Sequence, residues 1–572
     1  MEQRVRDLLK ISAWVGAERE CSAWRLDRVD NLVSIVLAIG SPALAGYSLA
    51  MTRLNSRWLS RQFLYLNFPN KNNIPLAVSA LQHIPFKIDT SSSLLPSLIV
   101  LPQNDKYWEG LAKAAKRTRQ WSIPVAMNIL WVLVAFLLTI VDSFVDFDHF
   151  ITVPGDAGYS IAAVWTWLLP LVVGWFHVGS QPDSDHLRSA LDDAHESAYV
   201  ATALEPALAT QVTGRSTRAI KPSARHIDHV NADEKKTAPI FNYSRVFIWS
   251  QNAEHILRLY ENATAKADRK IPVRCGENWT SNDDSTIRAD DRTGNEAEVV
   301  LYCTDELPDT VGHGPIDSTL KLPTPQHPTP PTLYSASPPS RKSPTTTFST
   351  ASTAEVYTNA SAFVHRRFPS TMSSNYDEEA PSVELRTTPG KPLFATEVFH
   401  RVFFAVVLTL VLQWGTTGAA ILIHLKTPPE GMGCRALTFT IYGAASTAAF
   451  LLLLLSSILA HLARRQRLRE KRSGSKKLVG YIAMFTRWLG KLIAIANGFG
   501  ILLSCTMQFA GAYDNCFCSS SIFWGDPNGL VSFVEDDVKG SEVYNVWISG
   551  ITTAFGVSGL YTFAIYVATP MG

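Results

Sequence analysis

The sequence lacks the short motifs by which many enzymes are recognised. No GxSxG, HExxH, Walker or GxGxxG pattern occurs in its 572 residues, and no set of acidic residues has a spacing suited to general acid–base chemistry. The seven cysteines include no CxxC pair, so neither a zinc ribbon nor a dense disulfide framework is expected. We therefore expect a protein that is not an enzyme and that binds no cofactor and no metal.

The long apolar runs lack charged side chains near their centres, where a charge would mark an ion or proton route. Lys491 lies close to the inner end of such a run, where its side chain reaches the lipid headgroups. A helix needs about twenty mostly apolar residues to cross a hydrocarbon core of roughly 30 Å. Seven segments meet or approach that length: 31–51, 123–144, 160–178, 403–424, 437–461, 488–510 and 546–567.

The first of these segments is the least regular. It contains Ser34, Gly40, Ser41, Pro42 and Gly46, so a re-entrant or interfacial element is the alternative to a full span there. Residues 1–30 lack the apolar core of a secretory signal. We therefore expect membrane insertion to begin with a retained span.

Positive charge is distributed unequally between the loops, which predicts the orientation. The loop after the fifth segment reads ARRQRLREKRSGSKK, whereas the loop after the second, VDFDHFITVPGDAG, has three aspartates and no lysine or arginine. This pattern predicts an external N-terminus, with the middle segment and the C-terminus in the cytosol. If the first segment does not cross, only the N-terminus changes side. We expect four N-x-[ST] sequons in the cytosolic middle to stay unglycosylated: Asn242, Asn262, Asn278 and Asn359.

Composition divides the chain into five parts: an N-terminal segment (1–30), a first membrane half (31–178, with a cytoplasmic loop at 52–121), a helical cap (179–304), a Pro/Ser/Thr-rich segment (305–395) and a second membrane half (396–572). The cap is predicted from its helical periodicity. The Pro/Ser/Thr-rich segment has too little apolar surface to offset its ordering entropy. The predicted fold class is an all-α membrane protein, a bundle of about seven transmembrane helices with a small cytoplasmic helical cap and a long disordered loop.

Six separated blocks occur in order: SPALAGYSLA, TRQWSIPVAMNILWVLVAF, TWLLPLVVGW, ADEKKTAPIFNYSR, QWGTTGAA and GCRALTFTIYGAAST. Together they resemble a family of uncharacterised multi-pass membrane proteins of filamentous fungi. The resemblance covers both membrane halves and the cap, and it implies no activity, ligand or catalytic residue. The Pro/Ser/Thr-rich segment fits none of these blocks, which suggests a variable insert.

Mild polarity is concentrated on the fourth segment. Gln413, Thr417, Ala420 and His424 recur at helical spacing and share one stripe. Such a stripe either lines a polar cavity or forms hydrogen bonds to another helix, and we favour the second interpretation. Asn128 and Asn497 are candidate partners for Gln413.

Three cysteines are expected on the external face, besides Cys21 of the N-terminal segment if the first segment crosses the membrane. Cys434 lies between the fourth and fifth segments, and Cys516 and Cys518 follow the sixth, so the predicted topology places all three in one oxidising compartment. We predict a disulfide between Cys434 and either Cys516 or Cys518. A bridge between Cys516 and Cys518, or three free thiols, are the alternatives.

These features favour a non-enzymatic sensor, scaffold or regulator in a membrane, and they leave open whether this is the plasma membrane or an endomembrane. The alternatives are a transporter or channel and a seven-helix receptor-like protein, the last by analogy of fold alone. The expected partners are the lipid bilayer and cytoplasmic proteins that bind the PxxP motif at 325–328. No nucleic-acid partner is expected.

Overall fold

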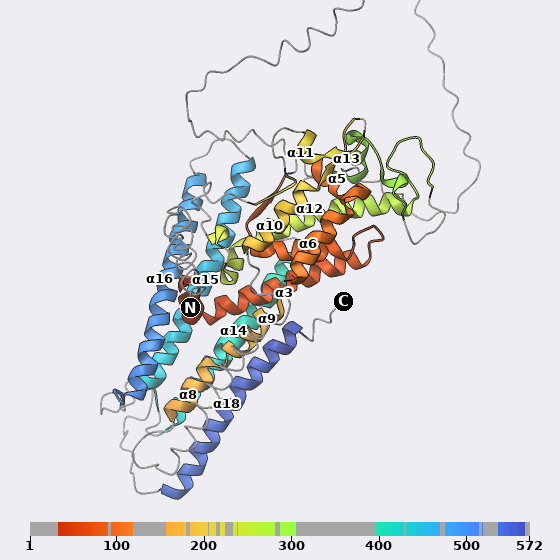
Figure 1. Ribbon diagram of the computed structural model, residues 1–572. Coiled ribbons are helices and arrows are strands. Elements are labelled where there is room, and N and C mark those ends of the chain that lie inside the picture. Colours follow the sequence, from red (N-terminus) through yellow and green to blue (C-terminus); the bar gives the residue numbers. More distant parts are fainter. Residues whose placement is uncertain are drawn as a thin grey trace, which may run out of the picture. The chain divides into compact units, whose positions relative to one another are not determined.

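The structure, a computed structural model, is mostly helical (Figure 1). It describes residues 32–89, 93–117, 156–178, 184–203, 205–212, 218–222, 233–236, 238–280, 287–304, 396–427, 431–469, 475–513, 518 and 536–566. The expected disordered segment, 305–395, and the second predicted span, 123–144, lie outside these ranges.

Within the described residues, four helices are long and apolar enough to cross a membrane. They are α14 (Thr396–Lys426), α15 (Cys434–Arg469), α16 (Ser475–Phe509) and α18 (Asp536–Tyr566). Helix α15 packs along α16, and α14 packs against both α15 and α18. A Cβ on Gly415 would lie 2.5 Å from Val557 Cγ1, so a small residue is needed for α14 and α18 to approach so closely. These helices support a membrane protein, and they correspond to the four predicted spans of the second half.

The first predicted span is not a straight helix. A helix at Leu32–Gly40 meets α3 (Pro42–Leu64) at an angle of 106°. Pro42 has no backbone N–H, which suits the first position of a helix. Ser41 caps that helix, because its Oγ accepts a hydrogen bond from Leu44 N at 3.4 Å. The first predicted segment, 31–51, is therefore a broken helix, which fits either a bent span or the re-entrant alternative.

The third predicted span, 160–178, is also divided. Helix α8 (Asp156–Trp165) and helix α9 (Leu168–Val178) are separated by two residues. Thr166 Oγ1 donates to Ala162 O at 2.9 Å, which satisfies a carbonyl group at the end of α8. The prediction of seven spans is thus not confirmed: within the described residues four helices, or five if the bent pair counts as one span, are long and apolar enough to cross a membrane.

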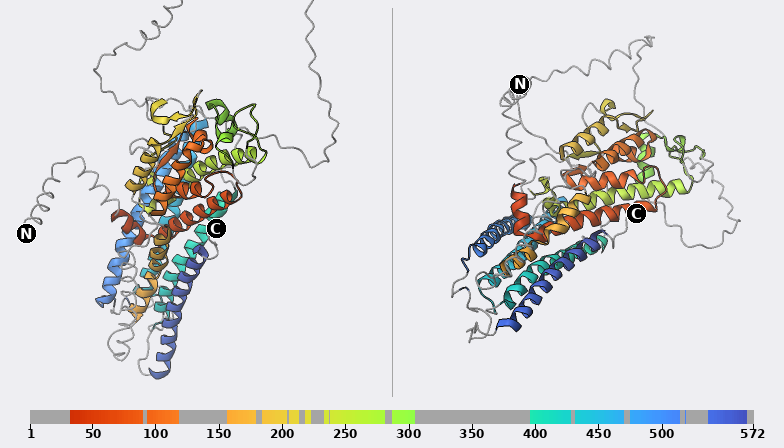
Figure 2. Two further views of the ribbon diagram at one scale, coloured as in Figure 1. Left: turned by 45° about the vertical axis from the view of Figure 1, so that its right-hand side comes forward. Right: turned by 60° about the horizontal axis from the view of Figure 1, so that its bottom comes forward.

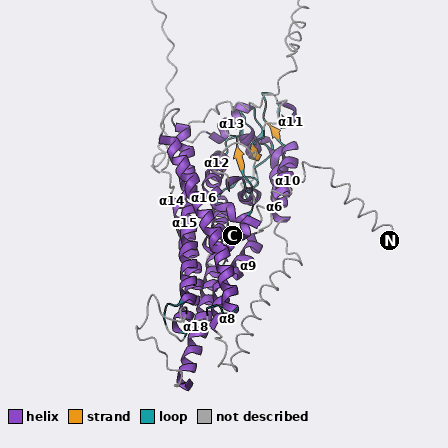
Figure 3. Ribbon diagram, turned by 90° about the vertical axis from the view of Figure 1, so that its left-hand side faces the viewer, coloured by secondary structure: helices purple, strands orange, loops and turns teal. Residues whose placement is uncertain are grey.

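The remaining helices and strands form the cap (Figures 1 and 3). The helices are α4 (Asn73–Ala80), η2 (Leu81–His83), α5 (Leu94–Val100), η3 (Pro102–Asn104), α6 (Asp105–Arg117), α10 (Ser184–Glu196), α11 (Ala209–Val212), η6 (Pro239–Phe241), α12 (Asn242–Asp268), η7 (Asp290–Arg292) and α13 (Glu296–Thr304). Two antiparallel ribbons pair β1 (Phe86–Ile88) with β4 (Ile220–Pro222) and β2 (Tyr199–Val200) with β3 (Ala207–Leu208).

The cap includes more of the chain than predicted. Residues of α4, α5 and α6 share one apolar core with α10, α12 and α13, although 52–121 was expected to be a loop. Trp108 and Trp249 are buried in this core and donate to Leu98 O and Val78 O at 2.8 and 2.9 Å. Each indole N–H thus has the partner that a buried tryptophan needs. The two parts of the chain therefore form a single cap domain.

Candidate functional site

A polar cluster surrounds the break in the first element. Gln413 Oε1 accepts hydrogen bonds from Ala43 N at 3.2 Å and from Ser446 Oγ at 3.0 Å. Gln413 Nε2 donates to Thr417 Oγ1 at 3.0 Å. A helix end leaves backbone groups without intrahelical partners, and Gln413 supplies one of those partners to α3.

The carbonyl groups on the other side of the break are also bonded. Asn497 Nδ2 donates to Gly40 O at 2.8 Å and to Tyr442 O at 3.0 Å, and Tyr442 OH donates to Ile39 O at 2.8 Å. A Cβ on Gly40 would lie 1.7 Å from Ala494 O, so only glycine fits at this contact. The break is therefore closely packed against the long helices, and its polar groups are used by those contacts.

All four residues of the predicted stripe, Gln413, Thr417, Ala420 and His424, are buried inside the protein. The His424 ring stacks on Phe439, with centroids 5.4 Å apart. Asn497, one of the two candidate partners of Gln413, instead donates to Gly40 O and Tyr442 O. The other candidate, Asn128, lies outside the described residues. The stripe thus contacts neighbouring helices and the broken element.

A second polar cluster lies where the cap contacts the long helices. Asp233 is fully buried and accepts hydrogen bonds from Tyr243 OH at 2.5 Å and from Lys491 Nζ of α16. Burial, followed by the neighbouring Asp233 carboxylate, holds the pKa of Tyr243 well above its usual value. The phenol therefore remains a donor to Asp233. The Lys491 ammonium also lies 5.5 Å from the ring centroid of Phe241.

The cap residues near Asp233 and Tyr243 form further bonds to α3 and α15. Ser48 Oγ of α3 donates to Ile240 O at 2.8 Å, and Ser457 Oγ of α15 donates to Tyr243 O at 3.1 Å. The cap segment is therefore bonded to α3, α15 and α16 together.

Beside this segment, a cavity of about 10 Å³ has a lining that includes Thr52, Asn55, Gln82, Asn242 and Arg245. A cavity of this size is just large enough for one water molecule. Asn242 Nδ2 donates to Thr52 Oγ1 at 2.8 Å, and Asn55 Nδ2 donates to Gln82 Oε1 at 3.1 Å. Burial lowers the pKa of Arg245 to about 10, and Glu234 partly offsets this effect. The guanidinium donates to Lys236 O and Asn242 Oδ1, so it joins the cap segment to this network.

Arg401 extends the network to α14. Its Nη1 donates to Asn55 Oδ1 at 2.6 Å, and its guanidinium lies 4.2 Å from the centroid of the Trp58 ring. A continuous set of polar contacts thus connects α14, α3 and α12. This arrangement is suited to coupling the cap to the bundle.

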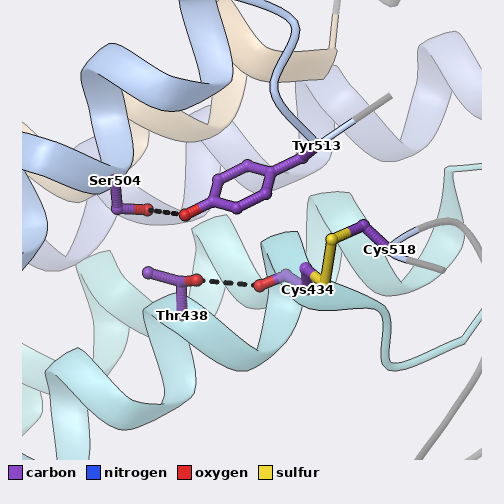
Figure 4. Close-up of a disulfide and its surroundings, with 5 residues drawn as sticks. All are labelled: Cys434, Thr438, Ser504, Tyr513 and Cys518. Atoms are coloured by element: carbon purple, nitrogen blue, oxygen red, sulfur yellow. Dashed lines mark hydrogen bonds between the residues drawn. A yellow bond between two sulfur atoms is a disulfide. The ribbon is translucent and has the colours of Figure 1, made fainter. Parts of the chain in front are cut away.

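At the other end of α15, Cys434 forms a disulfide with Cys518 (Figure 4). This is one of the two pairings expected from the sequence, and Cys516 lies outside the described residues. Thr438 Oγ1 donates to Cys434 O at 2.8 Å, and Tyr513 OH donates to Ser504 Oγ at 3.4 Å. The structure places this disulfide at the beginning of α15, whereas Arg464, in the last part of the same helix, pairs with Glu234 of the cap at 3.5 Å. One helix therefore connects the disulfide end to the cap.

Sequence reasoning did not identify the pairing of Asp233 with Lys491. The available signals were a lysine near the inner end of an apolar segment and an aspartate in the block ADEKKTAPIFNYSR. Neither feature of the sequence identifies the residue with which it pairs. Comparison of the chain with protein-family models, curated proteins and solved structures gives no match.

Proposed function

We propose that the chain is a polytopic membrane protein with seven membrane segments, the first being the broken helix, and a cytosolic cap. Its function is that of a non-enzymatic scaffold, sensor or regulator in which the cap and the bundle move together. The basic loop at 464–477 supports the orientation, as does the disulfide at the opposite end of α15. We also propose membership of the fungal membrane protein family that the six sequence blocks resemble.

One observation carries this proposal: the buried Asp233 side chain joins Tyr243 of the cap to Lys491 of a membrane-length helix. A buried ion pair contributes little net stability compared with apolar packing, but it is costly to separate. A change of packing around α16 would therefore be transmitted to the cap. Cytoplasmic proteins that bind the Pro-rich segment would be the partners that respond to it.

A transporter would use the broken helix differently. In transporters, unwound backbone at mid-membrane depth coordinates the substrate or the ion. Here Gly40 O and Ile39 O accept bonds from Asn497 and Tyr442, and Ala43 N donates to Gln413. These contacts favour a packed structural junction over a binding site.

Cysteine accessibility tests the choice. We expect Gln413→Cys, Thr417→Cys and Ala420→Cys to stay unlabelled by a water-soluble maleimide in the folded protein, because all three positions are buried in helix contacts. The exposed native Cys275 is the positive control in each variant. Labelling of any stripe position from water, with the variant still monodisperse, would favour a transport pathway and contradict the proposal.

A further inference from the structure

Helix α3 changes its surroundings along its length. Residues 42–52 are buried, whereas the second half of the helix has two distinct faces. Asn55, Leu59 and Phe63 are buried on one face, and the last two belong to the cap core. The opposite face carries the arginine row, Arg53, Arg57 and Arg61, spaced four residues apart so that neighbouring side chains lie close together.

The arginine row begins near the ends of two membrane-length helices. The Arg53 guanidinium lies 5.9 Å from the ring centroid of Tyr566, the last residue of α18. Trp58 Nε1 donates to Glu397 Oε2, near the start of α14, at 2.5 Å. Both views in Figure 2, like Figure 1, show α3 beside the cap-proximal ends of α14 and α18. In the proposed orientation, this is the depth of the cytosolic headgroups.

The arginine row has no acidic partner among the described residues. Arg53 Nε, Arg57 Nε and Arg57 Nη1 are shielded from solvent and have no hydrogen-bond acceptor in that part of the chain. Some other arginines of the cap do have an acidic partner, as Arg292 has in Asp105 at 2.7 Å. Like charges four residues apart on a helix repel one another, and buried N–H groups without acceptors are costly. An anion beside the accessible part of the guanidinium groups would relieve the repulsion, and the shielded N–H groups show that the described residues supply no acceptor there.

Phosphate is the anion that suits this geometry. A guanidinium binds phosphate through two parallel N–H bonds, and several arginines can share one headgroup. The row continues into apolar side chains, since Leu64 is 62% exposed and Tyr65 is 84% exposed. Basic residues beside aromatic and aliphatic ones are typical of a membrane interface, where the former contact headgroups and the latter the acyl boundary.

We infer that Arg53, Arg57 and Arg61 bind the headgroup phosphate of an anionic phospholipid in the cytosolic leaflet. This site is separate from the basic loop at 464–477. The assignment to the cytosolic leaflet rests on the proposed orientation of the cap. Binding of a lipid to the arginine row can be measured in detergent, where the orientation has no influence. A failure of lipid binding is therefore distinguishable from a failure of the topology, which is measured independently through Cys275.

The test uses the purified full chain in a neutral detergent, titrated with dioctanoyl phosphatidylserine, with dioctanoyl phosphatidylcholine as the uncharged comparison. Each basic residue near an anionic surface contributes about 1 kcal/mol, so R57Q should weaken binding about fivefold and R53Q/R57Q/R61Q on the order of 100-fold. The matched control is K106Q/K113Q/K116Q. It removes the same charge from exposed positions of α6, and we expect it to leave the affinity unchanged.

Two results would overturn the inference. Equal weakening by the arginine and lysine triple variants would mean that only overall charge matters. Binding of inorganic phosphate as tightly as of the lipid would mean that the row takes a soluble anion. If the triple variant is not monodisperse, R57Q alone decides, because an unchanged affinity in R57Q removes the proposed site.

Discussion

Replacing Lys491 by methionine tests the contact between the cap and α16. The substitution keeps the length and apolar part of the side chain but removes the ammonium. Asp233 is 0% exposed, whereas the Lys491 side chain is 21% exposed. K491M therefore leaves a carboxylate in a site that water does not reach.

The expected loss follows from that asymmetry. Removing one partner of a buried ion pair costs about 3–5 kcal/mol, because the remaining charge is uncompensated. D233N should cost less, about 1–3 kcal/mol, since the Lys491 ammonium keeps some contact with water and Tyr243 keeps an acceptor. The double variant D233N/K491M should lose about 2 kcal/mol less than the sum of the single losses, because the two residues interact directly.

The assay is an unfolding titration in mixed detergent micelles, combined with limited proteolysis of the cap. The matched control is R274Q, which removes one partner of the exposed pair Arg274–Glu277, whose side chains are 50% and 49% exposed. Exposed pairs contribute about 0–1 kcal/mol, so this variant should resemble the wild type. A K491M loss no larger than that of R274Q, or strictly additive losses in the double variant, would refute the proposed coupling.

Three further predictions concern the two ends of the bundle and the cap. Of the three sequons that the structure describes, only Asn278 is exposed. If the cap is cytosolic, Asn278 should carry no glycan. A mass shift that is removed by endoglycosidase and abolished by N278Q would place the cap outside. The Cys434–Cys518 bond closes a sequence separation of 84 residues and should contribute about 4–5 kcal/mol to the free energy of unfolding in the chain-entropy model. C434S should therefore unfold at a lower denaturant concentration. Recovery of Cys434 as a free alkylated thiol from unreduced protein would show that the bond does not form. Burial lowers the pKa of His195 and of His255. As the pH falls towards and below the unfolded pKa of 6.5, the unfolded state therefore binds more protons than the folded state, and the cap loses stability. The unfolding midpoint should decrease from pH 7.5 to pH 5.5 in the wild type and less in H195Q/H255Q, and equal decreases would exclude both histidines.

Hydropathy predicted the second membrane half well because it depends on local composition alone. The segments 403–424, 437–461, 488–510 and 546–567 each lie in, or end one residue beyond, one of the four long helices. The helices extend further, as α16 does from Ser475 rather than from 488. An apolar window reports only the part of a helix that suits hydrocarbon, so polar helix ends are not included.

The first element shows where local sequence is insufficient. A break is indicated by Gly40, Ser41 and Pro42, but mean hydropathy does not distinguish two helices joined at a bend from one continuous span. The bend is stabilised by Gln413 and Asn497, which lie several hundred residues away. Such partners cannot be read from the local sequence.

The cap was underestimated for a similar reason. Helices α4 and α5 are too short to show a clear period, and β1 pairs with β4 across more than a hundred residues. The pairing of Asp233 with Lys491 spans 258 positions. The distribution of charge predicts a cytosolic cap, but it does not identify which residues attach the cap to the bundle.

The side of the membrane on which the cap lies can be measured directly with the native thiol of Cys275. This residue is exposed in the cap, whereas Cys303 and Cys505 are buried. A membrane-impermeant maleimide is applied to intact and to permeabilised cells, with C275S identifying the labelled site. We expect labelling of Cys275 only after permeabilisation, and labelling in intact cells would contradict a cytosolic cap.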